Sequence, residues 1–398
     1  SILKDSLLTT KYRLFLLAMR AFHILPLLVL SLACLNVRTT AFIVGGAVMH
    51  HGALALDPRN FNSSSPNATD AATALHYAAL HAGLFIQSLE PEIVVLITPH
   101  GLALTQPYVL YNNPSTDGSV DVDAWLPCSF PPCAYNASAR IDVSLTKQLE
   151  TSLVGLKLNV MTLSGFGPPG DSTLPLPLAW GEVIPLYFIN RAYSDPARTV
   201  HPQPDHPRLS ESYRRRRRTV ELKHKQLLRS QTHRGRIAGN GGRSTTAAAT
   251  ADSLPRFVIL SIPSRRYNQS AQMVPELLAL GAGLFADLDS LDERIAVVVS
   301  GDLAHTWDPQ GPYGFSVHAE PFDTAVLQWA RNLDRNALLK TAAKHVLEAK
   351  SCGFPGMVIF QGLMDNIKPD NMHSVLLEYG HPSYYGMMCA VFDFQGDA

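Results

Sequence analysis

Short, continuous runs of apolar, mostly β-branched residues constrain the fold of this chain more than any other feature. The clearest runs cover residues 40–49, 92–98, 256–262 and 294–300. Such a run is typical of a strand buried on both faces, as in a parallel sheet. Three of these runs lead directly into loops that carry His50-His51, His100 and His305. Because sites in open α/β sheets form outside the carboxyl ends of the strands, we expect these imidazoles to share one rim.

Helical patterns and polar loops alternate with the apolar runs. We expect helices at about 69–84, 141–153, 273–287, 322–331 and 336–349, further buried strands at 183–189 and 356–360, and loop-rich sequence at 58–70, 105–135 and 165–177. A β-loop-α-β order favours a parallel sheet. The sequence therefore predicts a single α/β domain with a mostly parallel central sheet flanked by helices.

Residues 191–255 interrupt this pattern. They contain five consecutive arginines at 214–218, followed by Arg-, Gly-, Ser- and Thr-rich sequence without apolar periodicity. Such a stretch cannot bury enough apolar surface to order itself, so we predict a disordered basic insertion in a surface loop. A solvated tether is favoured over a segment that binds an acidic partner or nucleic acid. The domain then comprises residues 40–190 and 256–398.

Residues 1–39 form a separate segment. From Met19 to Leu35 a basic start precedes an apolar run that is shorter than the ~20 residues needed to span a bilayer. A signal peptide or membrane-proximal anchor, an unstructured leader, and extra translated sequence are the alternatives. Sequons at Asn62, Asn67, Asn136 and Asn268 are compatible with secretion. The compartment is therefore left open between the cytoplasm and, if this segment is a signal peptide, the secretory pathway.

Composition and cysteine spacing exclude some classes of function. The formal net charge of zero over 398 residues indicates no nucleic-acid partner. Five cysteines, at Cys34, Cys128, Cys133, Cys352 and Cys389, are too scattered for a disulfide framework and include no CxxC zinc pair. In an oxidising compartment Cys128 and Cys133, which flank Ser-Phe-Pro-Pro, could close a small loop.

The order of several short motifs resembles that of one family. The motifs are an early strand ending in a histidine, Thr-Pro-His-Gly at 98–101, Ser-Gly-Asp-Leu-Ala-His at 300–305, Gly-Pro-Tyr-Gly-Phe at 311–315, Phe322-Asp323, and Ser-Cys-Gly-Phe-Pro-Gly-Met-Val-Ile-Phe-Gln-Gly-Leu at 351–363. Together they resemble the class III extradiol ring-cleavage dioxygenases. More specifically, they are similar to the catalytic chain of protocatechuate 4,5-dioxygenase, in a superfamily that includes the Memo proteins. The likeness covers about 40–190 and 256–390.

The resemblance implies a non-haem metal site. In ring-cleaving members, two histidines and a carboxylate hold ferrous iron and leave positions open for a catechol and dioxygen. His51 and His100 match the two histidine ligands, and His305 matches the acid/base group beside the metal. Asp302 could hold the imidazole tautomer of His305. His50 matches less well, because successive side chains of a strand point to opposite faces.

The third ligand departs from the ring-cleaving pattern. Cys352 aligns best with the expected glutamate, as in Memo-like relatives, while Glu348 and Glu320 are alternative carboxylates. Ala179-Trp180-Gly181 also stands where many ring-cleaving relatives have Asp-His-Gly. The other histidines considered are expected in packing or solvent positions of a helix (His76, His81) or in loops (His318, His373, His381), where His381 could line the pocket.

These matches predict a metal-dependent dioxygenase that cleaves a catechol-type aromatic diol with O2. Fe(II) is the expected metal, with Zn or Cu as alternatives, and a homo-oligomer is compatible with the sequence. An imidazole pKa near ~6.5 suits His305 to both proton transfers of the reaction. The alternative is a Memo-like metal-binding or interaction protein that has lost ring cleavage, which the soft thiolate of Cys352 favours. A metal-dependent hydrolase has no sequence feature in its favour.

Overall fold

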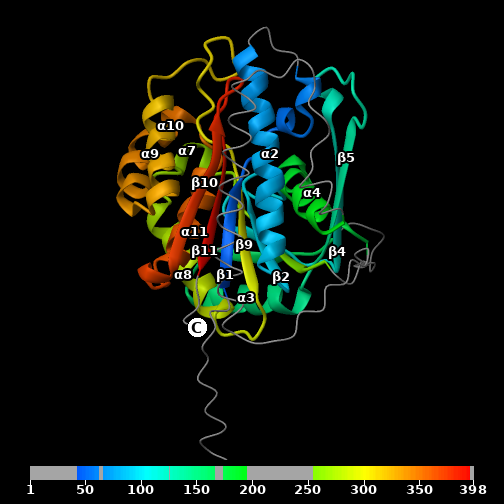
Figure 1. The fold of residues 1–398 in the computed structure, drawn as a ribbon. Helices are drawn as coiled ribbons and strands as arrows, with labels where there is room; N and C mark the ends of the chain where they lie inside the picture. The colour runs from blue at the N-terminus through cyan, green and yellow to red at the C-terminus, as the bar shows by residue number, and fades with distance from the viewer. Residues whose placement is uncertain (1–42, 62–65, 125, 166–173, 195–253, 395–398) are drawn as a thin grey trace, which may run out of the picture. The chain divides into compact units, whose positions relative to one another are not determined.

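A sheet of eight strands lies at the centre of the fold (Figure 1). The computed structural model describes residues 43–61, 66–124, 126–165, 174–194 and 254–394. The strands of this sheet are β1 (Ile43–Met49), β2 (Ile93–Thr98), β3 (Tyr108–Tyr111), β6 (Val160–Leu163), β8 (Arg256–Ser261), β9 (Ile295–Ser300), β10 (Met372–Gly380) and β11 (Met387–Phe394). They follow the order β10-β11-β1-β9-β2-β8-β3-β6 across the sheet. The predicted leader, and the predicted insertion apart from its two ends, lie outside the described residues.

The sheet is mixed, so the prediction of a mostly parallel sheet is wrong. The neighbours β1, β9, β2 and β8 pair in parallel, as their continuous apolar runs predicted. However, β3 pairs antiparallel with β8, and β11 pairs antiparallel with β1. Strand β10 in turn forms an antiparallel hairpin with β11 at the edge of the sheet. Antiparallel strands need only a short turn between them, so no crossover helix marks them in the sequence. His373 consequently lies in β10 and not in a loop.

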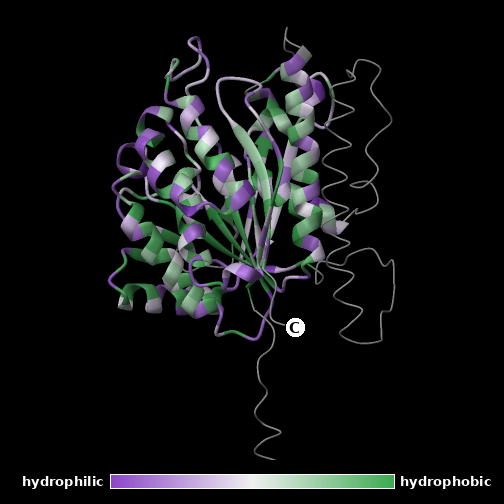
Figure 2. Ribbon diagram, turned by 60° about the vertical axis from the view of Figure 1, so that its left-hand side comes forward, coloured by the Kyte–Doolittle hydropathy of each residue, from purple (hydrophilic) through white to green (hydrophobic). Residues whose placement is uncertain are grey.

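Helices cover both faces of the sheet. One face carries α3 (Val143–Gly155), α8 (Val274–Leu288), α9 (Ala319–Asn332), the π-helical turn η5 (Ala337–Ala342), α10 (Ala343–Ala349) and α11 (Phe354–Met364), and the other carries α2 (Pro66–Ser88) and α4 (Trp180–Ser194). Figure 2 shows that the central strands consist mostly of hydrophobic residues, whereas the helices around them alternate hydrophobic and hydrophilic residues. The five predicted helices are confirmed. Among the described residues, no helix combines the length and apolarity needed to cross a membrane.

Two apolar runs that were predicted as strands are helices instead. Residues 183–189 belong to α4 and residues 356–360 belong to α11. Every residue of α11 is buried, and α4 is buried over most of its length. A helix surrounded by apolar neighbours shows no polar face, so periodicity cannot distinguish it from a buried strand.

Glycines let α11 pack directly against the backbone of α8. A Cβ atom at Gly281 of α8 would lie 2.0 Å from the Ile359 carbonyl oxygen of α11. A Cβ atom at Gly362 of α11 would lie 2.4 Å from the Leu278 carbonyl oxygen of α8. The two helices are therefore closer than any side chain at these positions would allow.

Short elements fill the segments between the main helices and strands. They are the single helical turns η1 (Ala53–Ala55), η2 (Pro58–Asn60), η3 (Val122–Ala124), α7 (Arg266–Gln269) and η6 (Pro369–Asn371), and a second sheet of β4 (Ser115–Asp121), β5 (Ala134–Arg140) and β7 (Leu176–Pro177) in the order β5-β4-β7. Residues 105–135, predicted to be loop-rich, therefore contain two complete strands, β3 and β4. All of β3 is buried, and buried and exposed residues alternate along most of β4. The Gly, Asn and Asp residues in and around these strands hide this pattern in the sequence.

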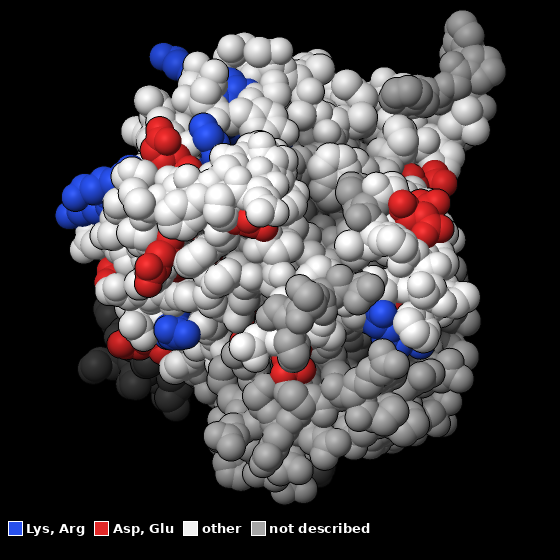
Figure 3. All heavy atoms as spheres, turned by 90° about the horizontal axis from the view of Figure 1, so that it is seen from above, with Lys and Arg blue, Asp and Glu red and all other residues white. Residues whose placement is uncertain are grey.

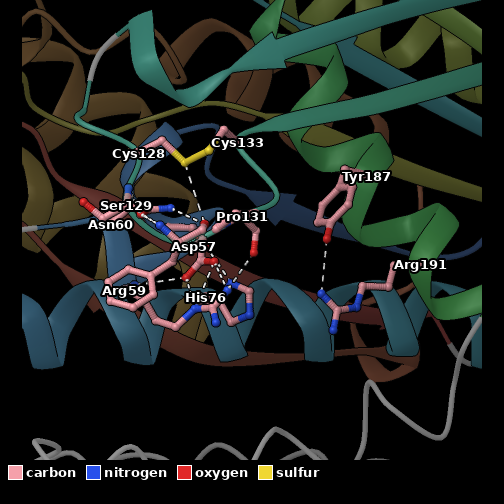
Figure 4. A network of polar contacts seen from close by, with 12 residues as sticks. Asp57, Arg59, Asn60, His76, Cys128, Ser129, Pro131, Cys133, Tyr187 and Arg191 are labelled. Atoms are coloured by element: carbon pink, nitrogen blue, oxygen red, sulfur yellow. Dashed lines mark hydrogen bonds and ion pairs between the residues drawn. A yellow bond between two sulfur atoms is a disulfide. The ribbon is translucent and has the colours of Figure 1, made fainter.

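A disulfide joins Cys128 and Cys133, as their spacing suggested (Figure 4). The enclosed loop packs on η2, where the side-chain oxygen of Asn60 accepts hydrogen bonds from the backbone N–H groups of Ser129, at 2.9 Å, and Phe130, at 2.8 Å. The Asn60 amide also donates to the Phe130 carbonyl at 3.0 Å. One asparagine thus fixes the loop to the main body of the protein.

Candidate metal centre

Three potential metal ligands converge at the carboxyl ends of the strands. His51 follows β1, His100 follows β2, and Cys352 precedes α11. A ring nitrogen of each histidine and the Cys352 sulfur all lie within 4.8 Å of one another. His51 and Cys352 are buried, whereas His100 is partly exposed. Donors from three separate segments therefore meet at one point, with His100 as the most exposed of the three residues.

Hydrogen bonds orient the His51 ring toward Cys352. The Ser300 hydroxyl donates its proton to the Gly181 carbonyl, at 2.5 Å, and lies 2.9 Å from His51 Nδ1. A hydroxyl has only one proton, so Ser300 must accept a hydrogen bond from Nδ1–H. The lone pair of the neutral imidazole is then on Nε2, which lies 3.3 Å from Cys352 Sγ. This arrangement presents His51 as a ligand through Nε2.

Asp302 contacts two of the three ligand residues. Its Oδ1 accepts a hydrogen bond from the His51 backbone N–H at 3.2 Å, and its Oδ2 lies 3.4 Å from His51 Nε2. Its own backbone N–H donates to Cys352 Sγ at 3.3 Å. Burial raises the pKa of Asp302 to about 8. Asp302 thus holds His51 and Cys352, whereas its predicted role was to orient His305.

His100 lies between an aromatic ring and a cation. Its ring stacks on Trp180, with centroids 4.8 Å apart, and meets the His51 ring edge-on at 4.9 Å. The Nη2 atom of Arg266 lies 3.4 Å from His100 Nδ1. Burial, with smaller contributions from Arg266 and His305, lowers the pKa of His100 to about 3. His100 is therefore neutral, and one of its two ring nitrogens is a potential metal donor.

His305 lies near the same cluster without belonging to it. Its ring stacks on Tyr385, at 5.7 Å between centroids, and meets Tyr313 edge-on at 5.8 Å. Its Nδ1 atom is buried and has no hydrogen-bond partner among the described residues. Burial lowers the pKa of His305 to about 4. The charge of His305 also lowers the pKa of both His51 and His100, which places the three imidazoles within electrostatic range of one another.

The other sequence candidates lie outside the cluster. Glu320 on α9 and Glu348 on α10 are both exposed, and neither carboxylate belongs to the group of converging donors. His50 points away, with Nε2 3.3 Å from the Leu75 carbonyl of α2, as strand alternation predicted. Of the histidines expected in helices or loops, His76 contacts the Ala55 carbonyl, His81 is buried on α2, His318 pairs with His345, and His381 stacks on Trp307.

Sequence reasoning missed Ser300 and Arg266. Ser300 is the last residue of β9 and a polar residue in an otherwise apolar run, which is a usable signal. Arg266 follows β8, the fourth parallel strand, just as the candidate histidines follow the other three. The carboxyl ends of all four strands meet at one rim, so polar residues in the loop after β8 are expected to reach the same site. Figure 3 shows the face above this rim, where charged side chains are separated by mostly uncharged surface.

Two known proteins are similar to this chain, one over part of its sequence and one in its structure. No family model matches the chain. It is 26% identical over 93 residues to Protein CA_C1420 of Clostridium acetobutylicum, and this match covers 23% of the chain and 20% of that protein. In structure it is similar to the uncharacterized protein JW3007 from Escherichia coli K12, with a TM-score of 0.40 and 13% identity over 88% of this chain and 99% of that chain. Function is therefore inferred from the site itself.

Proposed function

We propose that this protein binds one transition-metal ion through His51, His100 and Cys352. The observation that carries the proposal is the meeting of their three donor atoms within 4.8 Å at the carboxyl ends of the strands. Two imidazole nitrogens and one sulfur suit Zn, Cu or Fe, whereas Ca and Mg prefer oxygen ligands. Three protein ligands also leave a coordination position for a substrate, as in catalytic metal sites.

The spacing of the donors fits such an ion. Metal–sulfur and metal–nitrogen bonds of about 2.3 Å and about 2.0 Å at a tetrahedral angle place nitrogen and sulfur about 3.5 Å apart. His51 Nε2 lies 3.3 Å from Cys352 Sγ, and no donor atom is more than 4.8 Å from another.

The surrounding residues prepare the ligands for this role. Ser300 fixes the His51 tautomer, and the backbone N–H of Asp302 donates to the sulfur that must become a thiolate. Stacking on Trp180 restrains the His100 ring. When bound, the ion would supply Lewis-acid or redox chemistry at its open position. Contacts of this kind around metal ligands affect metal affinity by about 10- to 100-fold.

Elemental analysis of protein purified without oxygen tests the proposal. We expect near-stoichiometric metal in the wild type and its loss in Cys352→Ala and in the double variant His51→Ala/His100→Ala. Cys389→Ala is the matched control, because Cys389 is also a buried free cysteine but lies in β11. Metal retained by Cys352→Ala and lost from Glu348→Gln would show that a carboxylate is the third ligand. Metal retained by the double variant would overturn the proposal.

Because sulfur and not a carboxylate completes the donor group, the geometry favours the Memo-like metal-binding alternative over ring cleavage. Extradiol cleavage of a catechol-type diol is a second candidate, supported by His305. Its ring is within electrostatic range of His51 and His100, and its partner-free Nδ1 would be the atom that accepts a hydroxyl proton from a bound diol and returns it to the product. The test is reconstitution with Fe(II), followed by a panel of catechols and detection of yellow ring-opened product. Product formed by the wild type and lost in His305→Gln would support this candidate, and no product from any catechol would reject it.

A further inference from the structure

Arg266 is a buried cation without a counter-charge. The residue lies in the single turn α7, and only 2% of it is exposed. Within the described part of the chain, no carboxylate oxygen is within 4.0 Å of its guanidinium. Its guanidinium lies over the Tyr267 ring, with Cζ 4.1 Å from the ring centroid. Its hydrogen-bond contacts are long, at 3.4 Å to the Pro263 carbonyl and 3.4 Å to His100 Nδ1, and its Nε atom has no partner. Burying an unpaired charge is costly, so a role other than stability is expected for it.

Other arginines of the same domain are paired. Arg265, the preceding residue, forms an ion pair with Glu276. Arg256 contacts Asp142 at 2.6 Å, and Arg335 contacts Asp365 at 2.9 Å. These three side chains are all more exposed than Arg266. These three guanidinium groups have carboxylate partners, whereas the more deeply buried Arg266 has none among the described residues.

The position of Arg266 links this charge to the metal centre. Its guanidinium contacts His100, and, after burial and the neighbouring histidines, its charge helps to lower the pKa of His51. Arg266 is therefore a buried guanidinium beside the candidate metal centre, without a carboxylate partner among the described residues. An anionic group on the ligand would neutralise it.

We infer that the ligand of this centre carries an oxyanion, a carboxylate or phosphate group, that pairs with Arg266 beside His100. This inference rests on the proposed metal-binding function and adds the chemical class of the ligand to it. Planar guanidinium groups bind both kinds of oxyanion through paired, charge-assisted hydrogen bonds. Arg266 is accordingly a specificity-determining residue, and a neutral analogue of the same shape binds more weakly.

Three small probes test the inference on the full-length protein, with and without zinc. Benzoate carries a carboxylate, phenylphosphonate carries a phosphonate, and benzamide has the shape of benzoate without its charge. Because Trp180 is 40% exposed and stacks on His100, its fluorescence should report binding, with calorimetry as a second measurement. We expect at least one anion to bind the wild type about 10- to 100-fold more tightly than benzamide. The stronger of the two anions identifies the oxyanion.

Variants of two neighbouring arginines separate recognition from general charge. Arg266→Met should reduce the preference for the anion to about twofold or less, and Arg266→Lys should keep part of it. Arg265→Met is the matched control and should keep the full preference, because Arg265 is engaged with Glu276. Arg266→Met should also unfold at an equal or higher temperature without anion, since it removes an unpaired buried charge. Benzoate or phenylphosphonate should raise the unfolding temperature of the wild type alone.

The outcomes are distinct for the two proposals. Equal binding of the anions and benzamide by the wild type, or an anion preference that persists in Arg266→Met, overturns the inference. Zinc measured in the same samples tests the metal proposal separately. If the wild type binds zinc but shows no anion preference, the metal site is supported and the oxyanion is rejected. If the wild type binds no zinc but shows an anion preference that is lost in Arg266→Met, the oxyanion is supported and the metal site is rejected.

Discussion

Substitution of Gly281 by Ala tests the close packing of α8 against α11. The added Cβ would lie 2.0 Å from the Ile359 carbonyl oxygen and 2.7 Å from the Leu363 backbone nitrogen, so the helices must separate by about 1 Å or more. Backbone atoms cannot rotate away, so the cost should reach or exceed the upper end of the usual overpacking range, about 3–4 kcal/mol. Alanine recovers about 1 kcal/mol of helix propensity. We expect the free energy of unfolding to decrease by about 2–3 kcal/mol.

Urea denaturation followed by circular dichroism measures this change. Gly155→Ala is the control, because Gly155 is also in a helix but a Cβ there meets nothing within 4 Å. The control should unfold at the wild-type urea concentration or slightly above it. Displacement of α11 should also weaken metal binding, since Cys352 lies just before this helix. If Gly281→Ala and Gly155→Ala unfold at the same midpoint with the same slope, the interpretation of a backbone-to-backbone contact is wrong.

Three further changes have defined outcomes. Burial raises the pKa of Asp323 from 3.8 to about 7, so its carboxyl group holds a proton more tightly in the folded state than in the unfolded state. The free energy of unfolding should therefore fall by up to about 4 kcal/mol as the pH rises from about 4 to about 7. Asp323→Asn should remove that component from denaturation curves measured across this pH range, and parallel curves for the two proteins would contradict it. Replacing Cys128 and Cys133, five residues apart, with Ser should cost at most about 2 kcal/mol in thermal or urea unfolding, and a larger loss would show a role beyond loop closure. Ser300→Ala frees the His51 tautomer and should weaken zinc affinity by about 10- to 100-fold in a competition titration, whereas unchanged affinity would argue against the hydrogen-bond assignment.

The central part of the fold could be predicted from the sequence. Strands β1, β2, β8 and β9 are buried on both faces, so their composition alone identifies them. Helices with one polar face, such as α9, were equally recognisable from their period. The same reasoning failed for α4 and α11, because burial on nearly all sides removes the polar face that marks a helix. It also missed the hairpin of β10 and β11, whose antiparallel pairing makes the sheet mixed.

The candidate site likewise includes residues that the sequence predicted and one residue that only the structure selects. The sequence determined that His51 and His100 lie at one rim, because each follows a buried strand and the carboxyl ends of parallel strands share an edge. It left the third ligand open among Cys352, Glu348 and Glu320. Only the tertiary structure brings Cys352 to His51, across 301 residues of sequence, and leaves both glutamates outside the donor group. Cys352 lies just before α11, a helix held against α8 by close packing, and packing between distant segments leaves no local pattern in a sequence.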